Sequence, residues 1–326
     1  MNDLKRKILA AAQTDLDAIE SALSENLTPH VELVKTIAGH ILFSGGKRLR
    51  PLLMLLSARL CGRSDPFCTK FSVIFEYLHA ATLIHDDVVD GARMRRSQPA
   101  AHIVWDSALA VLTGDFLLAR ALSIAAEAGS PPIIQTVSWV TENMSQGEIH
   151  QLSRKADLDL SEADYLEVIR CKTAVLFEGA CRSSAQLAGA PPDKEQALAN
   201  YGHHLGMAFQ MADDLLDYEG DTAALGKQAG ADLREGKLTL PVIRTLAAAD
   251  REDRAFIVTV IQNPDFSESE FHRLHHMMVE YGGIRDTRHA AEAHVQQAVG
   301  ALADFPASPT VDMLHDIAQY ALRRGA

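Results

Sequence analysis

The stretch EYLHAATLIHDDVVDGARMRR, residues 76–96, is an apolar helical run that ends in a cluster of carboxylates. A second stretch, FQMADDLLDYEGD at 209–221, repeats the pattern with another DDxxD. Residues i and i+4 share one face of an α-helix, and so do i+1 and i+4, so each motif is expected to direct three carboxylates at one patch. Like charges this close repel each other. The duplication therefore indicates a bound cation rather than two solvated helix ends.

Apolar residues recur at helical spacing through most of the 326-residue chain. Only 20 Gly and 12 Pro are present, and alternation typical of strands is scarce. Turn signals divide the chain into segments of helix length, and no stretch has the composition of an interdomain linker. We expect an all-α protein in which residues 1–326 form a single-domain helical bundle. The turn signals fall at residues 28–29, 44–46, 91, 129–132, 189–192, 220–236, 263–264 and 305–306.

The charge balance narrows the classes of partner and compartment. With 31 Lys+Arg and 43 Asp+Glu the net charge is −12, which argues against nucleic-acid binding through a basic face. The four cysteines form no CxxC pair, which is typical of reduced thiols in the cytoplasm. The most apolar stretch, 108–129, carries Asp115, Arg120 and Glu127, so we expect no transmembrane segment. The start of the chain has no signal-peptide pattern.

Carboxylates without Cys or His partners predict a hard cation, Mg²⁺ or possibly Mn²⁺. Mg²⁺ usually takes one or two carboxylates and leaves other positions to water and substrate phosphate, so the expected substrate is a diphosphate. Bound metals would act as Lewis acids that stabilise charge on departing pyrophosphate. The expected metal ligands are Asp86, Asp87, Asp90, Asp213, Asp214 and Asp217.

Basic residues near these motifs complete a candidate anion site. GGKRLRP at 45–51 combines glycines with Lys47 and Arg50 just before a helical run, whose N-terminus favours phosphate. Arg95 and Arg96 follow the first motif by five residues, and His79 precedes Asp86 by two helical turns. Each of these has a plain structural alternative, namely a solvated cation or a core histidine.

Taken together and in this order, six motifs resemble the trans-isoprenyl diphosphate synthases, the polyprenyl synthetase family. The resemblance implies a helical bundle around a deep apolar cavity and a homodimer. It covers residues 45–241, about two thirds of the chain, and leaves both ends matched only by helical character. The motifs are GGKRLRP (45–51), EYLHAATLIHDDVVDGARMRR (76–96), GDFLLARA (114–121), CKTA (171–174), FQMADDLLDYEGD (209–221) and GKQAGADLREGKLTLP (226–241).

The resemblance also implies site roles, position by position. The six aspartates would hold Mg²⁺ and through it the allylic diphosphate, which Arg95, Lys172, Gln210 and Lys227 would contact. Isopentenyl diphosphate would be bound by Lys47, Arg50, His79 and Arg96. Lys237 matches a second family lysine, Thr173 matches the neighbour that faces the developing cation, and Asp217 is the ligand least directly supported.

The chemistry that the resemblance implies needs no protein nucleophile. The allylic C–O bond ionises, the isopentenyl double bond attacks the carbocation, and a proton is lost to the released pyrophosphate. The absence of a Ser/His/Asp or Cys/His signature agrees with this. The product could be handed to a membrane.

Product length depends on the helix that carries the first motif. Thr82 and Ala81 lie about 6 and 7.5 Å before Asp86 along the helix axis, and both are small. Short-chain members place Phe or Tyr there, so the resemblance implies a long-chain synthase with farnesyl or geranylgeranyl diphosphate as primer and a C40 to C50 product. Leu78 and Phe75, about 12 and 16 Å back, would line or close the deeper cavity. Trp139 is a candidate floor.

Several alternatives stay open at this stage. A short-chain farnesyl or geranylgeranyl diphosphate synthase would share the site. A class I terpene cyclase or a head-to-head synthase would not need the second, basic diphosphate site. A non-catalytic partner subunit would not need both complete carboxylate motifs. Two departures from the family concern loop geometry and the tail: Ser97 replaces a common glycine, and Arg323 or Arg324 would have to cover the isopentenyl site.

Overall fold

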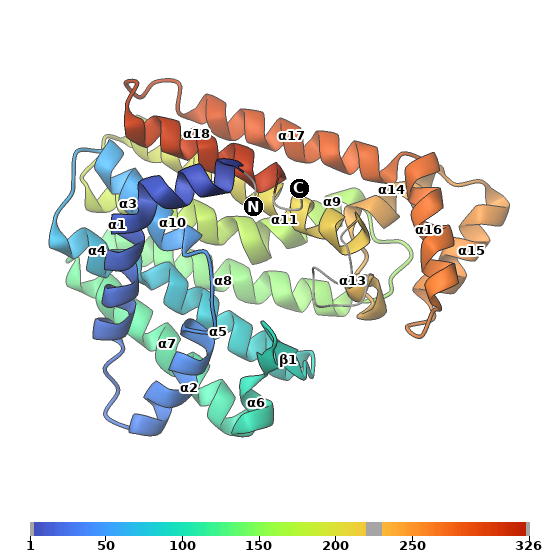
Figure 1. Cartoon of the computed structure of the whole chain (residues 1–326), viewed down its shortest axis with the longest axis horizontal. Coiled ribbons are helices and arrows are strands. Elements are labelled where there is room, and N and C mark those ends of the chain that lie inside the picture. Colours follow the sequence, from blue (N-terminus) through green and yellow to red (C-terminus); the bar gives the residue numbers. More distant parts are fainter. Residues whose placement is uncertain (1–2, 220–229, 324–326) are drawn as a thin grey trace.

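The computed structural model describes residues 3–219 and 230–323, and these are almost entirely helical (Figure 1). The predicted all-α class is therefore confirmed; the described strands are the two-residue pair β1 (Met94–Arg95) and β2 (Gln98–Pro99). The helices of the first half are α1 (Asp3–Asn26), α2 (Glu32–Leu42), α3 (Leu49–Leu60), α4 (Pro66–Ser72), α5 (Ile74–Val89), α6 (Ala101–Val104), α7 (Ser107–Glu127) and α8 (Pro131–Ser153). Those of the second half are α9 (Glu162–Ile169), η1 (Arg170–Ala174), α10 (Val175–Leu187), α11 (Pro192–Glu219), α13 (Ala231–Arg234), α14 (Leu240–Ala248), α15 (Arg251–Ile261), α16 (Glu268–Glu280), α17 (Gly283–Ala301) and α18 (Pro309–Leu322).

Helix boundaries marked by Gly and Pro agree with the sequence prediction, but boundaries made by capping side chains were missed. Asp65 accepts hydrogen bonds from two backbone N–H groups at the start of α4, and Asp250 does the same for α15. Ser161 and Asp164 form a capping box at the start of α9. Such caps satisfy the free N–H groups of a first turn, and those of α9 and α15 do so without a Gly or Pro at the break, whereas α4 also has Pro66 in its first turn. A single Asp or Ser is too common to mark a break by itself.

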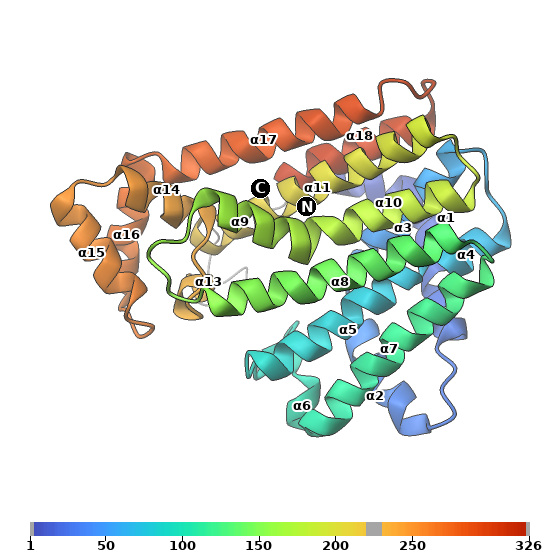
Figure 2. The ribbon, with the colours of Figure 1, turned by 180° about the vertical axis from the view of Figure 1, so that it is seen from behind.

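The long helices α8, α10 and α11 lie side by side through the middle of the molecule (Figures 1 and 2). α17 and α18 cover one side of α11, while α5 and α7 pack together on the opposite side of the bundle. Buried apolar residues form a large cluster in this bundle and a smaller one where α11 meets α14 and α16. The carboxylate motifs, at the end of α5 and near the end of α11, are thus held by the most extensively packed helices.

Two glycines let helices approach more closely than larger residues would allow. A Cβ at Gly206 of α11 would lie 2.5 Å from Ala174 Cα, and a Cβ at Gly114 of α7 would lie 2.3 Å from the ring of His85 on α5. Both separations are below van der Waals contact, so only glycine fits without a shift. These contacts set the distances from α11 to η1 and from α7 to α5.

Among the described helices, α7 is long and apolar enough, by length and composition, to cross a membrane. In this structure it packs along α5 and buries 39 % of its most apolar window. Its buried face includes Ala110, Leu117 and Ala121, whereas Leu112 on the other face is 63 % exposed. α7 is therefore half core helix and half exposed apolar surface.

Candidate active site

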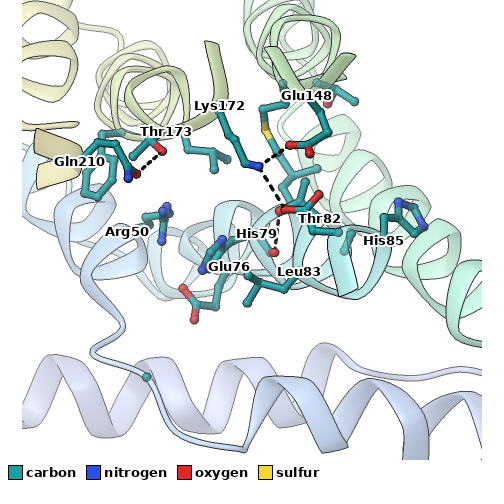
Figure 3. A pocket seen from close by; sticks show the side chains of 18 of the residues that line it. Arg50, Glu76, His79, Thr82, Leu83, His85, Glu148, Lys172, Thr173 and Gln210 are labelled. Carbon is teal, nitrogen blue, oxygen red and sulfur yellow. Dashed lines mark hydrogen bonds and ion pairs between the residues drawn. The ribbon is translucent and has the colours of Figure 1, made fainter. Parts of the chain in front are cut away.

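A cavity of about 910 Å³ lies between the α2–α3 loop and helices α5, α8, η1, α10 and α11 (Figure 3). It brings together most of the residues predicted from sequence, although they come from positions 47 to 213. The predicted residues that line it are Lys47, Arg50, Leu78, His79, Ala81, Thr82, Asp86, Arg95, Arg96, Lys172, Thr173, Gln210 and Asp213.

The six predicted carboxylates do not all face this cavity. Asp86 and Asp213 line it, whereas Asp87 and Asp214 are only 1 % and 2 % exposed and lie behind its wall. Successive helical residues are about 100° apart, so the second aspartate of each DD pair faces the core when the first faces the cavity. The expectation that each motif aims three carboxylates at one patch is corrected accordingly.

Each aspartate that does not line the cavity has defined hydrogen-bond donors. Arg95 Nε donates to Asp87 Oδ1 at 2.8 Å, and Gln210 and Tyr165 both donate to Asp214. Asp217 accepts backbone N–H groups of residues 231 and 232 at the start of α13. Asp90 accepts from Lys237 at 3.1 Å and from Lys155 at 3.2 Å. Lys237 therefore reaches the first motif from the segment that follows the second.

Burial raises the pKa of carboxyl groups at and behind the acidic side of the cavity. Burial, with help from Glu148 and Asp90 and against the opposing effect of Lys172, raises the pKa of Asp86 to about 6. Burial and the nearby Asp217 raise the pKa of Asp232 to about 7, and burial raises that of Asp214 well above its ordinary value. An added cation would favour the ionised form of all three.

The donor set fits a divalent metal that is shared with a substrate. Asp86 and Asp213 offer hard oxygens to the cavity, and the buried Oε1 of Glu148 has no hydrogen-bond donor within the described residues. Across residues 3–219 and 230–323, no three carboxylate, imidazole or thiol groups are close enough to hold a metal by themselves. Mg²⁺ commonly completes its shell with water and phosphate oxygens, which this arrangement would require.

A π-helical turn, η1, presents Lys172 and Thr173 to the cavity. Such turns insert one extra residue and often occur at functional sites. Lys172 Nζ pairs with Glu148 of α8 (Figure 3) and lies 4.0 Å from Asp86 Oδ2. It also donates to Gln151 at 2.9 Å. The turn needs Gly147 beside it, since a Cβ there would lie 2.6 Å from Cys171 Cβ.

The opposite side of the cavity is basic. Lys47, Arg50, His79 and Arg96 all line it. Burial and the positive charges of Arg50, Arg96 and Arg95 hold the pKa of His79 well below its ordinary value. A neutral imidazole surrounded by guanidinium groups is suited to an anionic ligand, to which it can donate one N–H.

Three residues that sequence reasoning did not single out, Arg48, Glu20 and Glu76, hold this basic side in place. Arg48 is 5 % exposed and has a left-handed backbone, with φ of 48°. Its guanidinium, at the cavity wall, binds Glu20 at 2.6 Å and Glu76 at 2.9 Å. These contacts anchor the loop that presents Lys47 and Arg50. No local signal could reveal them, because the partners lie 28 residues away on α1 and α5.

The deep wall partly matches the prediction. Leu78, Ala81 and Thr82 line the cavity, and Phe75 is fully buried one turn beyond Leu78. Trp139 does not line the cavity; its ring lies beneath the Arg182 guanidinium at 5.8 Å. The rotation of α8 instead turns Thr141 and Met144 to the cavity. Trp139 is therefore not the floor.

Two predicted residues, Lys227 and Arg324, fall outside the described residues. Arg323 is described and exposed, just beyond α18. That helix does reach the basic side, because Lys47 Nζ lies 5.1 Å from the ring centre of Tyr320.

Comparison with known proteins agrees with this fold and site. The polyprenyl synthetase family pattern matches residues 31–278. The octaprenyl diphosphate synthase of Escherichia coli is 36 % identical over 318 residues, which is 98 % of both chains. The all-trans-nonaprenyl-diphosphate synthase (geranyl-diphosphate specific) of Rhodobacter capsulatus is 36 % identical and covers 99 % of this chain and 98 % of its own.

Solved structures show the same architecture. A decaprenyl diphosphate synthase from Rhodobacter capsulatus superposes with a TM-score of 0.92 at 39 % identity, covering 99 % of each chain. A polyprenyl synthase from Caulobacter crescentus, solved with calcium and isoprenyl diphosphate, has a TM-score of 0.92 at 38 % identity and covers 99 % of this chain and 98 % of its own. The fold and cavity thus define a prenyltransferase of the polyprenyl diphosphate synthase class. The chain belongs to the polyprenyl synthetase family.

The hairpin beside the site predicts a stability change. Arg96 and Ser97 form the two-residue turn between β1 and β2, and both have positive φ, 49° and 63°. Such turns favour glycine, because a Cβ in this conformation is strained. Ser97→Gly is expected to raise the free energy of unfolding by roughly 0.5–1 kcal/mol, after the added entropy of the unfolded chain is deducted. Urea unfolding measures this; Ser97→Ala, which keeps the Cβ, is the control and should show no gain.

Proposed function

We propose that this enzyme condenses isopentenyl diphosphate with an allylic diphosphate, farnesyl or geranylgeranyl, in a Mg²⁺-dependent reaction that yields a long-chain all-trans polyprenyl diphosphate. The observation that carries the proposal is one cavity with a carboxylate side and a separate basic side. Two diphosphates need two anion sites, one of which is bridged by metal. The basic side distinguishes this reaction from that of a class I terpene cyclase, which takes one diphosphate.

On this proposal, Asp86 and Asp213 hold the metal together with the allylic diphosphate, and Asp90 and Asp217 support it from the rim. Mg²⁺, or Mn²⁺ in its place, supplies Lewis-acid stabilisation of the negative charge on the leaving diphosphate. Lys172, Gln210 and Arg95 contact the same diphosphate, and Lys227 is assigned this role by family position alone. Lys172 already lies 4.0 Å from Asp86, so it is placed to interact with an anion bound there.

The isopentenyl diphosphate is bound by the residues of the basic side, which hold its double bond toward the allylic carbon. These residues are Lys47, Arg50, His79 and Arg96. Fixing both partners in one cavity lowers the entropic cost of the encounter. Thr173 lies at the cavity wall, where its oxygen faces charge that develops as the allylic C–O bond breaks. The proton lost after C–C bond formation goes to the released pyrophosphate, so no side chain is needed as nucleophile or base.

We propose a product of C40 to C50. Ala81 and Thr82 leave the cavity open along α5 on the N-terminal side of Asp86, and the lining residues of the preceding turn are His79 and Leu78. The octaprenyl and decaprenyl synthases among the similar proteins support this length. We propose further that residues 1–326 act as one catalytic domain in the cytoplasm and that the apolar product passes to a membrane.

We also propose that the chain forms a homodimer through the apolar face of α2, α6 and α7. These three helices contact each other at one end of the molecule (Figure 1). Their exposed side chains include Leu33, Ile103, Val104 and Leu112, which are 41–63 % exposed. An apolar face of this kind, spread over three helices, is typical of a protein interface.

Turnover with purified protein tests the reaction. With Mg²⁺, isopentenyl diphosphate and farnesyl diphosphate, dephosphorylated products should form a ladder that ends at C40 to C50. Asp86→Ala and Asp213→Ala should each lower kcat by about 10²–10³-fold, because a charged group that stabilises the transition state is lost. Melting temperatures should stay near the wild-type value, since Asp213 is exposed and like-charge crowding is relieved.

Asp193→Ala is the matched control, because Asp193 is an exposed aspartate on α11, the helix that carries Asp213. This variant should retain activity. Absence of isopentenyl incorporation by the wild type would contradict the proposal. Variants that fail to fold would show that the two carboxylates are structural.

Product length should depend on the wall formed by α5. Ala81→Phe or Thr82→Phe should shorten the product to about C15 to C20, because an aromatic ring would obstruct the cavity within about 6–7.5 Å of Asp86. Chromatography of the dephosphorylated products measures this. Thr82→Ser, which adds no volume, should leave the length unchanged. Wild-type lengths in both Phe variants would refute the assignment.

The proposed dimer interface predicts that a charge placed in it lowers the mass of the protein in solution from that of a dimer to that of a monomer. Leu112→Glu places a charge in the proposed interface and should shift the chain from dimer to monomer in analytical ultracentrifugation. Val279→Glu is the control, because Val279 is 57 % exposed but lies on α16, away from this face. A wild-type protein that sediments as a monomer would overturn the proposal.

A further inference from the structure

A continuous chain of hydrogen bonds runs from the core to the cavity wall. Tyr165 of α9 donates its hydroxyl to Asp214 Oδ2 at 2.6 Å. Gln210 Nε2 donates to Asp214 Oδ1 at 2.7 Å, and Thr173 Oγ1 donates to Gln210 Oε1 at 2.8 Å (Figure 3 shows this last bond). Thr173 and Gln210 line the cavity, whereas Tyr165 and Asp214, 3 % and 2 % exposed, lie behind it.

We propose that Tyr165 and Asp214 are positioning residues that fix the amide of Gln210 and thereby turn the oxygen lone pairs of Thr173 toward the reacting allylic carbon. This inference rests on the proposed function, since it assigns that carbon to the cavity beside Thr173. It adds Tyr165, which lies outside all the sequence motifs, and it gives Asp214 a task other than metal binding.

The direction of the chain follows from the donors and acceptors available. Asp214 Oδ1 accepts, so the N–H end of the Gln210 amide must face it, and the carbonyl end must face Thr173. A threonine hydroxyl has one hydrogen, which is then committed to Gln210 Oε1. The lone pairs remain for the cavity, where a partial negative charge stabilises a carbocation.

Tyr165 fixes the rotation of the Asp214 carboxyl group. Its ring is packed in the smaller apolar cluster together with Leu215 and Tyr218 of α11, so its hydroxyl has little freedom. Asp214 is too buried for water to replace this donor readily. Without the hydroxyl, Asp214 can rotate, and Gln210 loses the partner that orients it.

The two adjacent aspartates of the second motif therefore divide their tasks. Asp213 is exposed to the cavity, where a metal and a diphosphate would lie. Both oxygens of Asp214 already accept hydrogen bonds, from Tyr165 and from Gln210, neither of which is a proposed metal ligand. Asp213 thus supplies a proposed metal ligand, whereas Asp214 anchors the amide of Gln210.

Steady-state kinetics of Tyr165→Phe tests the inference with Mg²⁺, isopentenyl diphosphate and farnesyl diphosphate. We expect kcat to fall about tenfold, the equivalent of one hydrogen bond, while KM for isopentenyl diphosphate stays within about twofold. The matched control is Tyr201→Phe, which removes another buried hydroxyl that donates to the Leu314 carbonyl at 2.8 Å. Tyr201→Phe should lower the melting temperature about as much as Tyr165→Phe does, but its kcat should stay at the wild-type value. Equal kcat in both variants would overturn the inference.

Crystal structures of the same variants give a readout that does not depend on turnover. In Tyr165→Phe, Gln210 should leave its contact with Thr173; in Tyr201→Phe, that contact should remain. A Gln210 that stays on Thr173 in Tyr165→Phe would overturn the inference, even if the wild type turned over. A wild type that incorporates no isopentenyl unit would instead refute the proposed function, and the crystal structures would still decide the role of Tyr165.

Asp214→Asn provides a second variant. An asparagine side chain has one acceptor oxygen, which cannot serve both the Tyr165 hydroxyl and the Gln210 amide as the carboxylate oxygens do. Its kcat should fall by more than that of Tyr165→Phe. A kcat equal to that of the wild type would contradict the anchoring role of Asp214.

Discussion

The close approach of α8 and α11 to the π-helical turn between them is the constraint on which the site depends. Gly147 on one side and Gly206 on the other leave no room for a Cβ, which would lie 2.6 Å from Cys171 Cβ or 2.5 Å from Ala174 Cα. The turn is thereby held between two long helices that are themselves in the core. Lys172 and Thr173 leave this turn toward one cavity. A wider spacing would separate Lys172 from Glu148 and Thr173 from Gln210, because these contacts are made across the same gaps.

Electrostatics then explain why so many ionisable groups tolerate burial around one cavity. Glu20 and Glu76, the second of which lines the cavity, bind Arg48 and offset part of the positive charge of the basic side. On the acidic side, Lys155 and Lys237 pair with Asp90, and their attraction outweighs its burial and holds its pKa below the ordinary value. The cation that faces Asp86, Lys172, lies 4.0 Å away, and burial raises the pKa of Asp86 to about 6, so added positive charge there would favour its ionised form.

Prediction from sequence was most successful where the signal is local. The helical class and several helix boundaries follow from apolar spacing and from Gly and Pro, and many of the motif residues converge on one cavity. Prediction from sequence was wrong where the rotation of a helix decides which side chains face the cavity. Trp139 lies under Arg182 because α8 turns Thr141 and Met144 inward, and the second aspartate of each DD pair faces the core. Periodicity shows that residues share a face, but it does not show which face meets which neighbour.

What the sequence by itself determined is the set of chemical groups: two carboxylate motifs, a basic loop, and small residues before the first motif, all on helices of predictable extent. These features depend on spacing along a single helix, where geometry is constant. Only the tertiary structure decided which groups meet. Tyr165 and Asp214 are 49 positions apart, and Arg48 and Glu76 are 28 apart, yet both pairs are in hydrogen-bond contact. Such pairings depend on how helices pack, since side chains distant in sequence become neighbours only when the core excludes water between them.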